Sequence, residues 1–181
     1  FTRDKYLDQI RPFIGKNLIK VLTGQRRVGK SYLLYQLMDE IKNQNPDAQI
    51  IYINKELNDF REITNDEELI NYIDSQIISE KENFVFIDEI QEIKDFEKAL
   101  RHFQALGRPD LYCTGSNARL LSGEFATMLS GRHIEFSVSG LSYSEYLKFN
   151  KLVNTNDSFF RHIRFGSLPY LVHLPDEEAV I

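Results

Sequence analysis

Gly24-Gln-Arg-Arg-Val-Gly-Lys-Ser31 is the stretch of this chain that decides its fold. It matches the pattern G-x-x-x-x-G-K-[ST], in which glycines permit a tight turn and backbone N–H groups surround phosphate oxygens. An apolar run over residues 17–23 precedes it, and apolar side chains at helical spacing follow from Ser31. Because a phosphate-binding loop needs this order of strand, turn and helix, the segment predicts nucleotide binding.

Each side chain of this loop has an expected role. Lys30 can reach the β- and γ-phosphates as a mobile charge, and Ser31 can offer its hydroxyl to Mg²⁺. Arg26 and Arg27 face phosphate, an acidic partner or solvent, and the sequence leaves these three alternatives open. The predicted nucleotide-binding residues are Gly24, Gln25, Arg26, Arg27, Val28, Gly29, Lys30, Ser31 and Tyr32, with Ser116 added from a later strand end.

Outward from the loop, short apolar runs alternate with stretches of helical period. This alternation predicts βαβ units, whose right-handed crossovers place helices on both faces of a parallel sheet. We expect an α/β P-loop NTPase fold, a three-layer sandwich with a five-stranded, mainly parallel sheet. The core is predicted over 1–152, and 153–181 would begin a helical C-terminal extension or a linker to a further domain. The expected strands are 17–23, 49–54, 84–87, 111–114 and 134–138, and the expected helices are 31–41, 66–78, 95–106, 143–149 and 157–165.

Two acidic residues follow the most apolar of these runs. Phe84–Ile87 leads directly into Asp88 and Glu89. The carboxyl ends of strands in an open α/β sheet form the crevice where ligands bind. Asp88 is therefore expected to hold Mg²⁺ together with Ser31, and Glu89 to orient or deprotonate an attacking water. The interval between Lys30 and Asp88 has room for a helix, a further strand and a second helix, as in P-loop ATPases with a strand inserted between these two motifs.

Two further groups are candidates for contact with the γ-phosphate. Asn117 or Ser116, after the run 111–114, could sense it, although either residue could instead cap a following helix. Arg132, just before the last strand, could spread positive charge over the transition state, from its own subunit or from a neighbouring one. Arg119 is a weaker candidate, and an exposed ion pair is the alternative for both arginines. The predicted catalytic residues are Glu89, Lys30, Arg132 and Asn117, and the predicted metal ligands are Ser31 and Asp88.

The composition limits the other classes of function. The 181 residues include 22 Lys and Arg against 27 Asp and Glu, a net charge of −5, which argues against a surface devoted to nucleic acid but leaves a local patch possible. No apolar run reaches the roughly 18 residues that a membrane span needs. The one cysteine, Cys113, excludes an intramolecular disulfide and favours a reducing, cytoplasmic location.

These motifs together resemble AAA family 14, a family of AAA+-type P-loop ATPases from prokaryotes. The likeness covers about residues 18–149, with a tail in RFGSLPYLV from Arg164, and Gly166-Ser167 stands where the family has a glycine pair. It implies an AAA+/ASCE sheet order, ATP and Mg²⁺ as ligands, a possible homo-oligomer, and a nuclease-like domain C-terminal to the core. The matching pieces are GQRRVGKS from Gly24, FIDEIQ from Phe86, TGSNARLLSGEF from Thr114, LSGR from Leu129 and LSYSEYL from Leu141.

Two functions from different classes fit these residues. The first is a Mg²⁺-dependent ATPase that converts ATP to ADP and phosphate and is coupled to a regulatory or DNA-related process. The second is a slow nucleotide-dependent switch, a binding module that regulates a partner or the C-terminal domain. The rate of ATP turnover distinguishes them.

Overall fold

The centre of the molecule is a parallel sheet of five strands. The structure is a computed structural model and describes residues 1–115 and 129–169. The strand order is β2-β3-β4-β1-β5, and every neighbouring pair is parallel. The expected α/β fold and its five strands are thus confirmed, with ends that differ from the predicted ones by two residues or fewer. The strands are β1 (Ile19–Thr23), β2 (Gln49–Asn54), β3 (Asn83–Asp88), β4 (Asp110–Gly115) and β5 (His133–Ser137).

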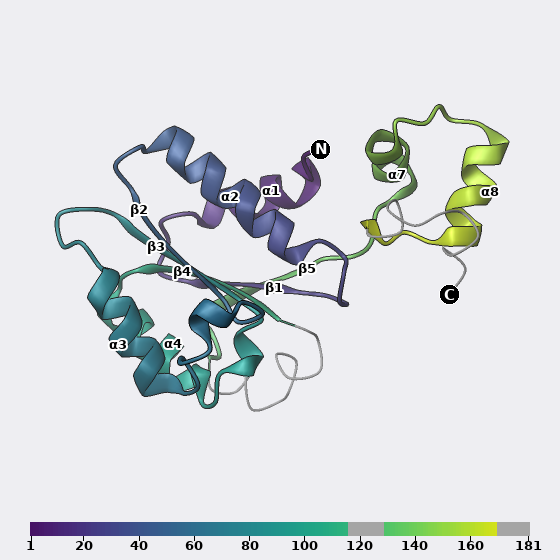
Figure 1. The fold of residues 1–181 in the computed structure, drawn as a ribbon. Helices are drawn as coiled ribbons and strands as arrows, with labels where there is room; N and C mark the ends of the chain where they lie inside the picture. Colours follow the sequence, from purple (N-terminus) through teal and green to yellow (C-terminus); the bar gives the residue numbers. More distant parts are fainter. Residues whose placement is uncertain (116–128, 170–181) are drawn as a thin grey trace.

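Helices cover both faces of the sheet (Figure 1). On one face lie α1 and α2, on the other α3 and α4, while α7 and α8 lie beyond the end of β5. Short 3-10 turns η1, η2 and η3 cover Arg11–Phe13, Asn58–Phe60 and Ile90–Glu92. The helices are α1 (Asp4–Ile10), α2 (Lys30–Gln44), α3 (Asp66–Gln76), α4 (Phe96–Leu106), α7 (Tyr143–Asn150) and α8 (Asn156–Phe165).

The central strands β1, β3 and β4 are buried along almost their whole length and are mainly apolar, because both of their faces are covered. Alternate side chains of these central strands enter different cores, one under α3 and α4 and the other under α1 and α2. On β3, Val85 belongs to the first core and Phe86 to the second, where it stacks on Tyr112 with ring centroids 4.5 Å apart. This arrangement confirms the three-layer sandwich.

The ends of the helices follow ordinary capping chemistry. The Asn65 side chain accepts a hydrogen bond from the backbone N–H of Glu68, so Asn65 caps α3. Helix α4 ends at Gly107, whose φ of 71° is the left-handed conformation that glycine adopts at little cost. Both helices therefore lie where the sequence pattern predicts them, α3 ending two residues earlier.

The strand order positions the two motifs that the sequence singles out. Strand β4 lies between β1, which leads into the phosphate loop, and β3, which ends in the acidic pair. Leu22 of β1 is in register with Thr114 of β4, and Ile87 of β3 with Cys113. All carboxyl ends therefore meet at one edge of the sheet, where β4 separates the end of β1 from the end of β3. The strand predicted in the interval between Lys30 and Asp88 is β2, which lies on the far side of β3.

A buried ion pair fixes the opposite, amino edge of the sheet. The Lys20 side chain is fully buried and its ammonium group pairs with the Asp110 carboxylate. The same carboxylate accepts hydrogen bonds from Tyr112 Oη at 2.8 Å and from the Gly15 backbone N–H at 2.9 Å. Burial lowers the pKa of Lys20, and the charge of Asp110 acts against this shift.

Removal of the Asp110 carboxylate should strongly destabilise the fold. In Asp110→Ala the buried ammonium of Lys20 loses its counter-ion and two further donors lose their acceptor, so we expect a loss of about 3–5 kcal/mol. The free energy of unfolding in urea measures the change. Asp8→Ala, which breaks the exposed pair with Arg11, is the control and should cost far less. Equal losses in the two variants would contradict this account.

The last two described helices pack on each other through aromatic side chains. The ring of Tyr143 lies 5.3 Å from that of Phe159, and Tyr146 lies 4.8 Å from the ring of His162. The aromatic face of α7 is therefore used for packing. Within the described ranges, no helix has the length and apolar character needed to cross a membrane. The domain boundary at residue 152 stays a prediction.

Candidate nucleotide-binding site

The loop between β1 and α2 has the backbone conformation that its glycines permit. Gly24 has a φ of 147°, and a Cβ there would lie 2.2 Å from the Val138 carbonyl oxygen. Gly29 has a φ of 96° and forms the N-cap of α2. Neither position suits an L side chain, because the first lacks space and both have positive φ. The two glycines of the sequence motif are thus required by the geometry of the turn.

Lys30 lies inside this loop. Its side chain is almost fully buried, and Nζ donates hydrogen bonds to the carbonyl oxygens of Gly24 and Gln25, each at 3.0 Å. Nζ also lies 3.8 Å from Oε1 of Glu89. Burial lowers the pKa of Lys30, while the carboxylates of Glu89 and Asp88 favour its charged form. The ammonium group is therefore held between the loop and the end of β3.

Asp88 is a fully buried carboxylate whose orientation two hydroxyl groups fix. Thr114 of β4 donates to Oδ1, and Tyr52 of β2 donates to Oδ2 at 3.3 Å. The Tyr52 hydroxyl is also hydrogen-bonded to Tyr35 of α2 at 3.1 Å. Burial, with the neighbouring Tyr35 and Asp88, raises the pKa of Tyr52, so it remains a donor. Each oxygen of Asp88 keeps a lone pair for a further ligand.

Glu89 has an unusual backbone conformation and a fixed side chain. Its φ of 56° lies in the left-handed region, and its N–H donates to Thr114 Oγ1 at 3.0 Å. Gln91 donates from Nε2 to Oε2 of Glu89, which leaves Oε1 facing Lys30. A strained backbone at a buried carboxylate is typical of functional sites. The acidic pair thus lies beside the loop, with Asp88 and Glu89 held by different hydrogen bonds.

The remaining predicted loop residues differ in exposure. Val28 is buried in the core under α1 and α2, and Ser31 is half-buried on the first turn of α2. The side chains of Arg26, Arg27 and Tyr32 are exposed. Arg27 has a φ of 67°, so it contributes to the turn through its backbone as well.

Arg132 does not lie at this edge of the sheet. It precedes β5, where His133 is in register with Ile19 at the amino end of β1, and its carbonyl accepts from the Ile19 N–H. The phosphate loop begins at the other end of β1, about five residues or 16 Å away along the strand. An arginine side chain spans less than half of this distance, so Arg132 does not reach the loop of its own chain. The predicted phosphate contacts of Ser116, Asn117 and Arg119 lie outside the described residues.

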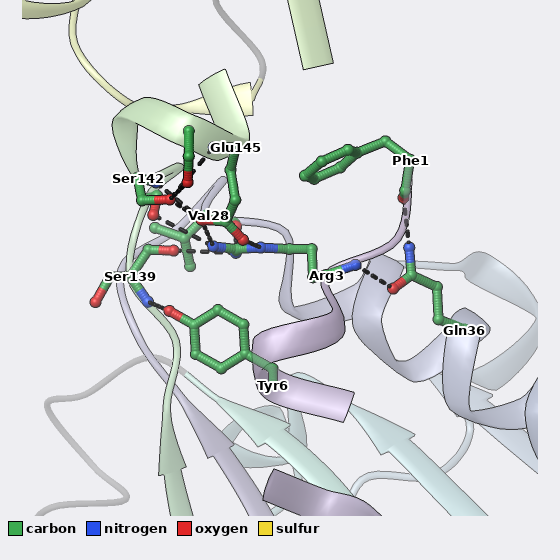
Figure 2. A network of polar contacts seen from close by, with 10 residues as sticks. Phe1, Arg3, Tyr6, Val28, Gln36, Ser139, Ser142 and Glu145 are labelled. Atoms are coloured by element: carbon green, nitrogen blue, oxygen red, sulfur yellow. Dashed lines mark hydrogen bonds and ion pairs between the residues drawn. The ribbon is translucent and has the colours of Figure 1, made fainter. Parts of the chain in front are cut away.

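Several residues of the site were missed in the sequence analysis. Tyr52 and Thr114 orient Asp88. Thr114 could have been found from the sequence, because it is a polar residue at the end of an apolar run. Arg3, from before α1, donates to the carbonyl oxygen of Val28 in the loop (Figure 2). No local pattern marks Arg3, since its partners are distant in the sequence.

The donor set fits a magnesium ion that binds together with a nucleotide. A hydroxyl from Ser31 and a carboxylate from Asp88 are oxygen ligands, which Mg²⁺ prefers, and phosphate oxygens usually complete its shell. Among residues 1–115 and 129–169, no group of three or more His, Cys, Asp and Glu side chains could by itself hold a metal ion.

The fold and the site define a P-loop nucleotide-binding module of the AAA+ class. The AAA_14 family model, an AAA domain, matches residues 16–147. The chain belongs to this family, which confirms the resemblance found in its motifs.

Two relatives are similar in sequence over almost the whole chain. A protein of Haemophilus influenzae is 37% identical over 177 residues, which is 94% of this chain and 44% of the relative. The protein MJ1544 of Methanocaldococcus jannaschii is 34% identical over 89% of this chain and 38% of its own length. The chain thus spans less than half the length of these relatives.

Solved structures share the fold at low sequence identity. Domain III of the Thermotoga maritima replication initiation protein DnaA aligns with a TM-score of 0.58 at 11% identity, over 93% of this chain and 78% of that domain. PCH-2 of C. elegans aligns with a TM-score of 0.53 at 18% identity, over 90% of this chain and 46% of that one. These similarities support the AAA+ fold.

Proposed function

We propose that this protein is a Mg²⁺-dependent ATPase that hydrolyses ATP to ADP and phosphate. The observation that carries the proposal is the meeting of three groups at one edge of the sheet: the Lys30 ammonium inside the loop, the Glu89 carboxylate 3.8 Å from it, and the buried carboxylate of Asp88. Membership of an AAA family supports the nucleotide, and the preference for ATP rests on that membership.

The residues of the chain have separate roles in this reaction. The loop amides and Lys30 bind and orient the triphosphate. Oε1 of Glu89, the oxygen that Gln91 does not occupy, accepts the proton of a water that attacks the γ-phosphorus, and the bond to the β-phosphate oxygen breaks to release ADP. Ser31 and Asp88 would hold Mg²⁺, which neutralises charge on the phosphates when bound. Asn117 is proposed to contact the γ-phosphate, with Ser116 as the alternative.

Calorimetric titration with a non-hydrolysable ATP analogue and Mg²⁺ tests the binding part of the proposal. We expect saturable binding of one nucleotide per chain, which weakens when Mg²⁺ is removed. A parallel titration with the matching GTP analogue measures the base preference. If neither ATP nor the analogue gave a binding signal at millimolar concentration, the proposed function would be contradicted.

Arg132 is proposed to act in a neighbouring subunit, because it does not reach its own loop. The rate per subunit should then rise with protein concentration as subunits assemble, and Arg132→Ala should lower the rate at high concentration by about a hundredfold or more. Steady-state ATPase assays over a wide dilution series measure both effects. Lys16→Ala removes an exposed charge from the same edge of the sheet and is the control. A rate per subunit that stays constant on dilution would contradict action in trans.

The alternative function is a slow nucleotide-dependent switch. The distance of Arg132 from its own loop favours the switch as the function of a separate subunit, because Arg132 of such a subunit does not reach the phosphate loop. A turnover near 10⁻⁴ per second, about that of isolated Ras-like switches, would favour the switch, and rates near one per second would favour the ATPase. The greater length of the relatives supports a C-terminal domain that either activity could regulate.

A further inference from the structure

The N-terminal segment supplies a buried cation next to the phosphate loop. Arg3 is only 4% exposed, although it lies close to the start of the chain and outside the range 16–147 that the family model matches. Its Cζ lies 4.5 Å from the centroid of the Tyr6 ring, and its backbone N–H donates to Gln36 of α2 at 3.2 Å. Such a charge is costly to bury unless every donor has a partner.

All five N–H groups of this guanidinium are used (Figure 2). Nη1 donates to the carbonyl oxygens of Val28 and Ser139, each at 3.0 Å, and Nη2 donates to that of Gly140 at 3.2 Å. Nε and Nη2 form a two-pronged pair with the Glu145 carboxylate, at 3.1 and 3.3 Å. Arg3 therefore joins three segments: the phosphate loop, the connection after β5, and helix α7.

The contact with Val28 bears directly on phosphate binding. The Val28 carbonyl and the Gly29 N–H belong to one peptide unit, and in a trans peptide these two groups point in opposite directions. A guanidinium that holds the carbonyl therefore also orients the Gly29 N–H. In G-x-x-x-x-G-K-[ST] loops, the backbone N–H groups of this part of the turn surround the phosphates. Gly29 has a φ of 96°, and glycine can rotate to many other backbone conformations. The hydrogen bond from Arg3 to the Val28 carbonyl restricts this rotation.

The contact with Glu145 connects the same peptide to α7. Glu145 is the N3 residue of a capping box, and it accepts hydrogen bonds from the backbone N–H and the hydroxyl of Ser142 at 2.8 and 2.9 Å. Despite partial burial, the hydrogen bonds from Arg3 and Ser142 hold the pKa of Glu145 below its usual range. The carboxylate is thus ionised near neutral pH, and the first turn of α7 is fixed to Arg3.

We propose that Arg3 is a positioning residue of the nucleotide site, which holds the Val28–Gly29 peptide in its phosphate-binding orientation and ties it to helix α7. The inference rests on the proposed nucleotide binding and adds a residue that the loop motif does not contain. Because binding couplings are reciprocal, a change in the position of α7 changes the affinity for the phosphates, and bound nucleotide strengthens the attachment of α7.

Arg3→Lys keeps the positive charge and loses the planar set of five donors, so it is the variant of choice. We expect ATP binding to weaken by about tenfold to a hundredfold, the range for loss of a hydrogen bond from a charged group. The dissociation constant is measured by titration with a fluorescent ATP analogue and Mg²⁺, well below the melting temperature of each variant. In ¹⁵N spectra of the nucleotide-free protein, the Gly29 amide resonance should shift in Arg3→Lys, which reports the orientation of the peptide.

Arg11→Lys is the matched control. Arg11 also lies near the N-terminus and forms a two-pronged pair, at 2.7 and 3.0 Å, with Glu40 of α2, but on the exposed surface. Its substitution should leave ATP affinity and the Gly29 resonance unchanged. Glu145→Gln keeps the fold of the capping box and removes the charge, so ATP affinity should fall several-fold through the loosened Arg3.

The outcomes separate this inference from the proposed function. A parent protein that binds no ATP overturns the proposed function and the inference with it. A parent that binds ATP while folded Arg3→Lys binds equally tightly overturns the inference alone. If Arg3→Lys does not fold, Glu145→Gln decides the matter: a lower melting temperature with unchanged ATP affinity would make Arg3 a purely structural anchor.

Discussion

Glu89→Gln is expected to bind ATP as tightly as the parent protein and to hydrolyse it about 10²–10⁴ times more slowly. Glutamine has the shape of glutamate and can still accept a hydrogen bond from Gln91, so the site keeps its geometry. It cannot take a proton from the attacking water, and general-base catalysis contributes rate factors of this size. Phosphate release at saturating ATP, together with a titration of ATP affinity, measures both expectations.

The neighbouring Glu92 provides the control for this experiment. It lies on the same 3-10 turn, three residues beyond Glu89, and its side chain is exposed. Glu92→Gln removes the same charge without touching the loop, so its turnover should equal that of the parent. If Glu89→Gln hydrolysed ATP at the parent rate, the assignment of the base would be wrong.

Lys30→Ala is expected to weaken ATP binding by about a hundredfold or more, to the point where ordinary titrations detect none. Among the charged side chains of the loop, only that of Lys30 is buried, while Arg26 and Arg27 are exposed. In the alanine variant the charge-assisted hydrogen bonds from Lys30 to the β- and γ-phosphates are lost. Calorimetry and a fluorescent ATP analogue give the affinity of both proteins.

The stability of this variant must be measured beside its affinity. Lys30 donates to two loop carbonyls, so its loss also changes the empty loop. Lys42→Ala, on the exposed face near the end of the same helix α2, controls for the loss of a lysine and should bind ATP normally. Parent-like affinity in a folded Lys30→Ala protein would show that the triphosphate does not bind at this loop.

The fold was predictable because its central strands are buried on both faces and leave mainly apolar runs, such as Phe84–Ile87. The first helix was not predicted, since seven residues of mixed character over Asp4–Ile10 give too short a pattern. Its apolar residues Tyr6, Leu7 and Ile10 are recognised only when the face of the sheet that they cover is known.

The candidate site was predictable where chemistry is local in the sequence. The loop at Gly24 and the pair Asp88-Glu89 are each contiguous, so their residue types alone indicate phosphate and metal. Tyr52 orients Asp88 across 36 positions, and Arg3 reaches Glu145 across 142. Such contacts depend on strand order and on how helices dock, which periodicity does not encode. The edge of the sheet at which Arg132 lies, amino or carboxyl, is likewise known only from the register of β5 with β1.

The placement of Arg132 and the phosphate loop at opposite edges of one sheet restricts the symmetry of any active assembly. A twofold axis that relates two antiparallel subunits brings the donor edge of each to the acceptor edge of the other, whereas copies that follow one another in the same direction join one donor edge to one acceptor edge at each contact. Under the proposed action in trans, an open row of subunits leaves one arginine without a pocket and one pocket without an arginine. A twofold dimer of that kind or a closed ring gives every active centre its full complement of groups.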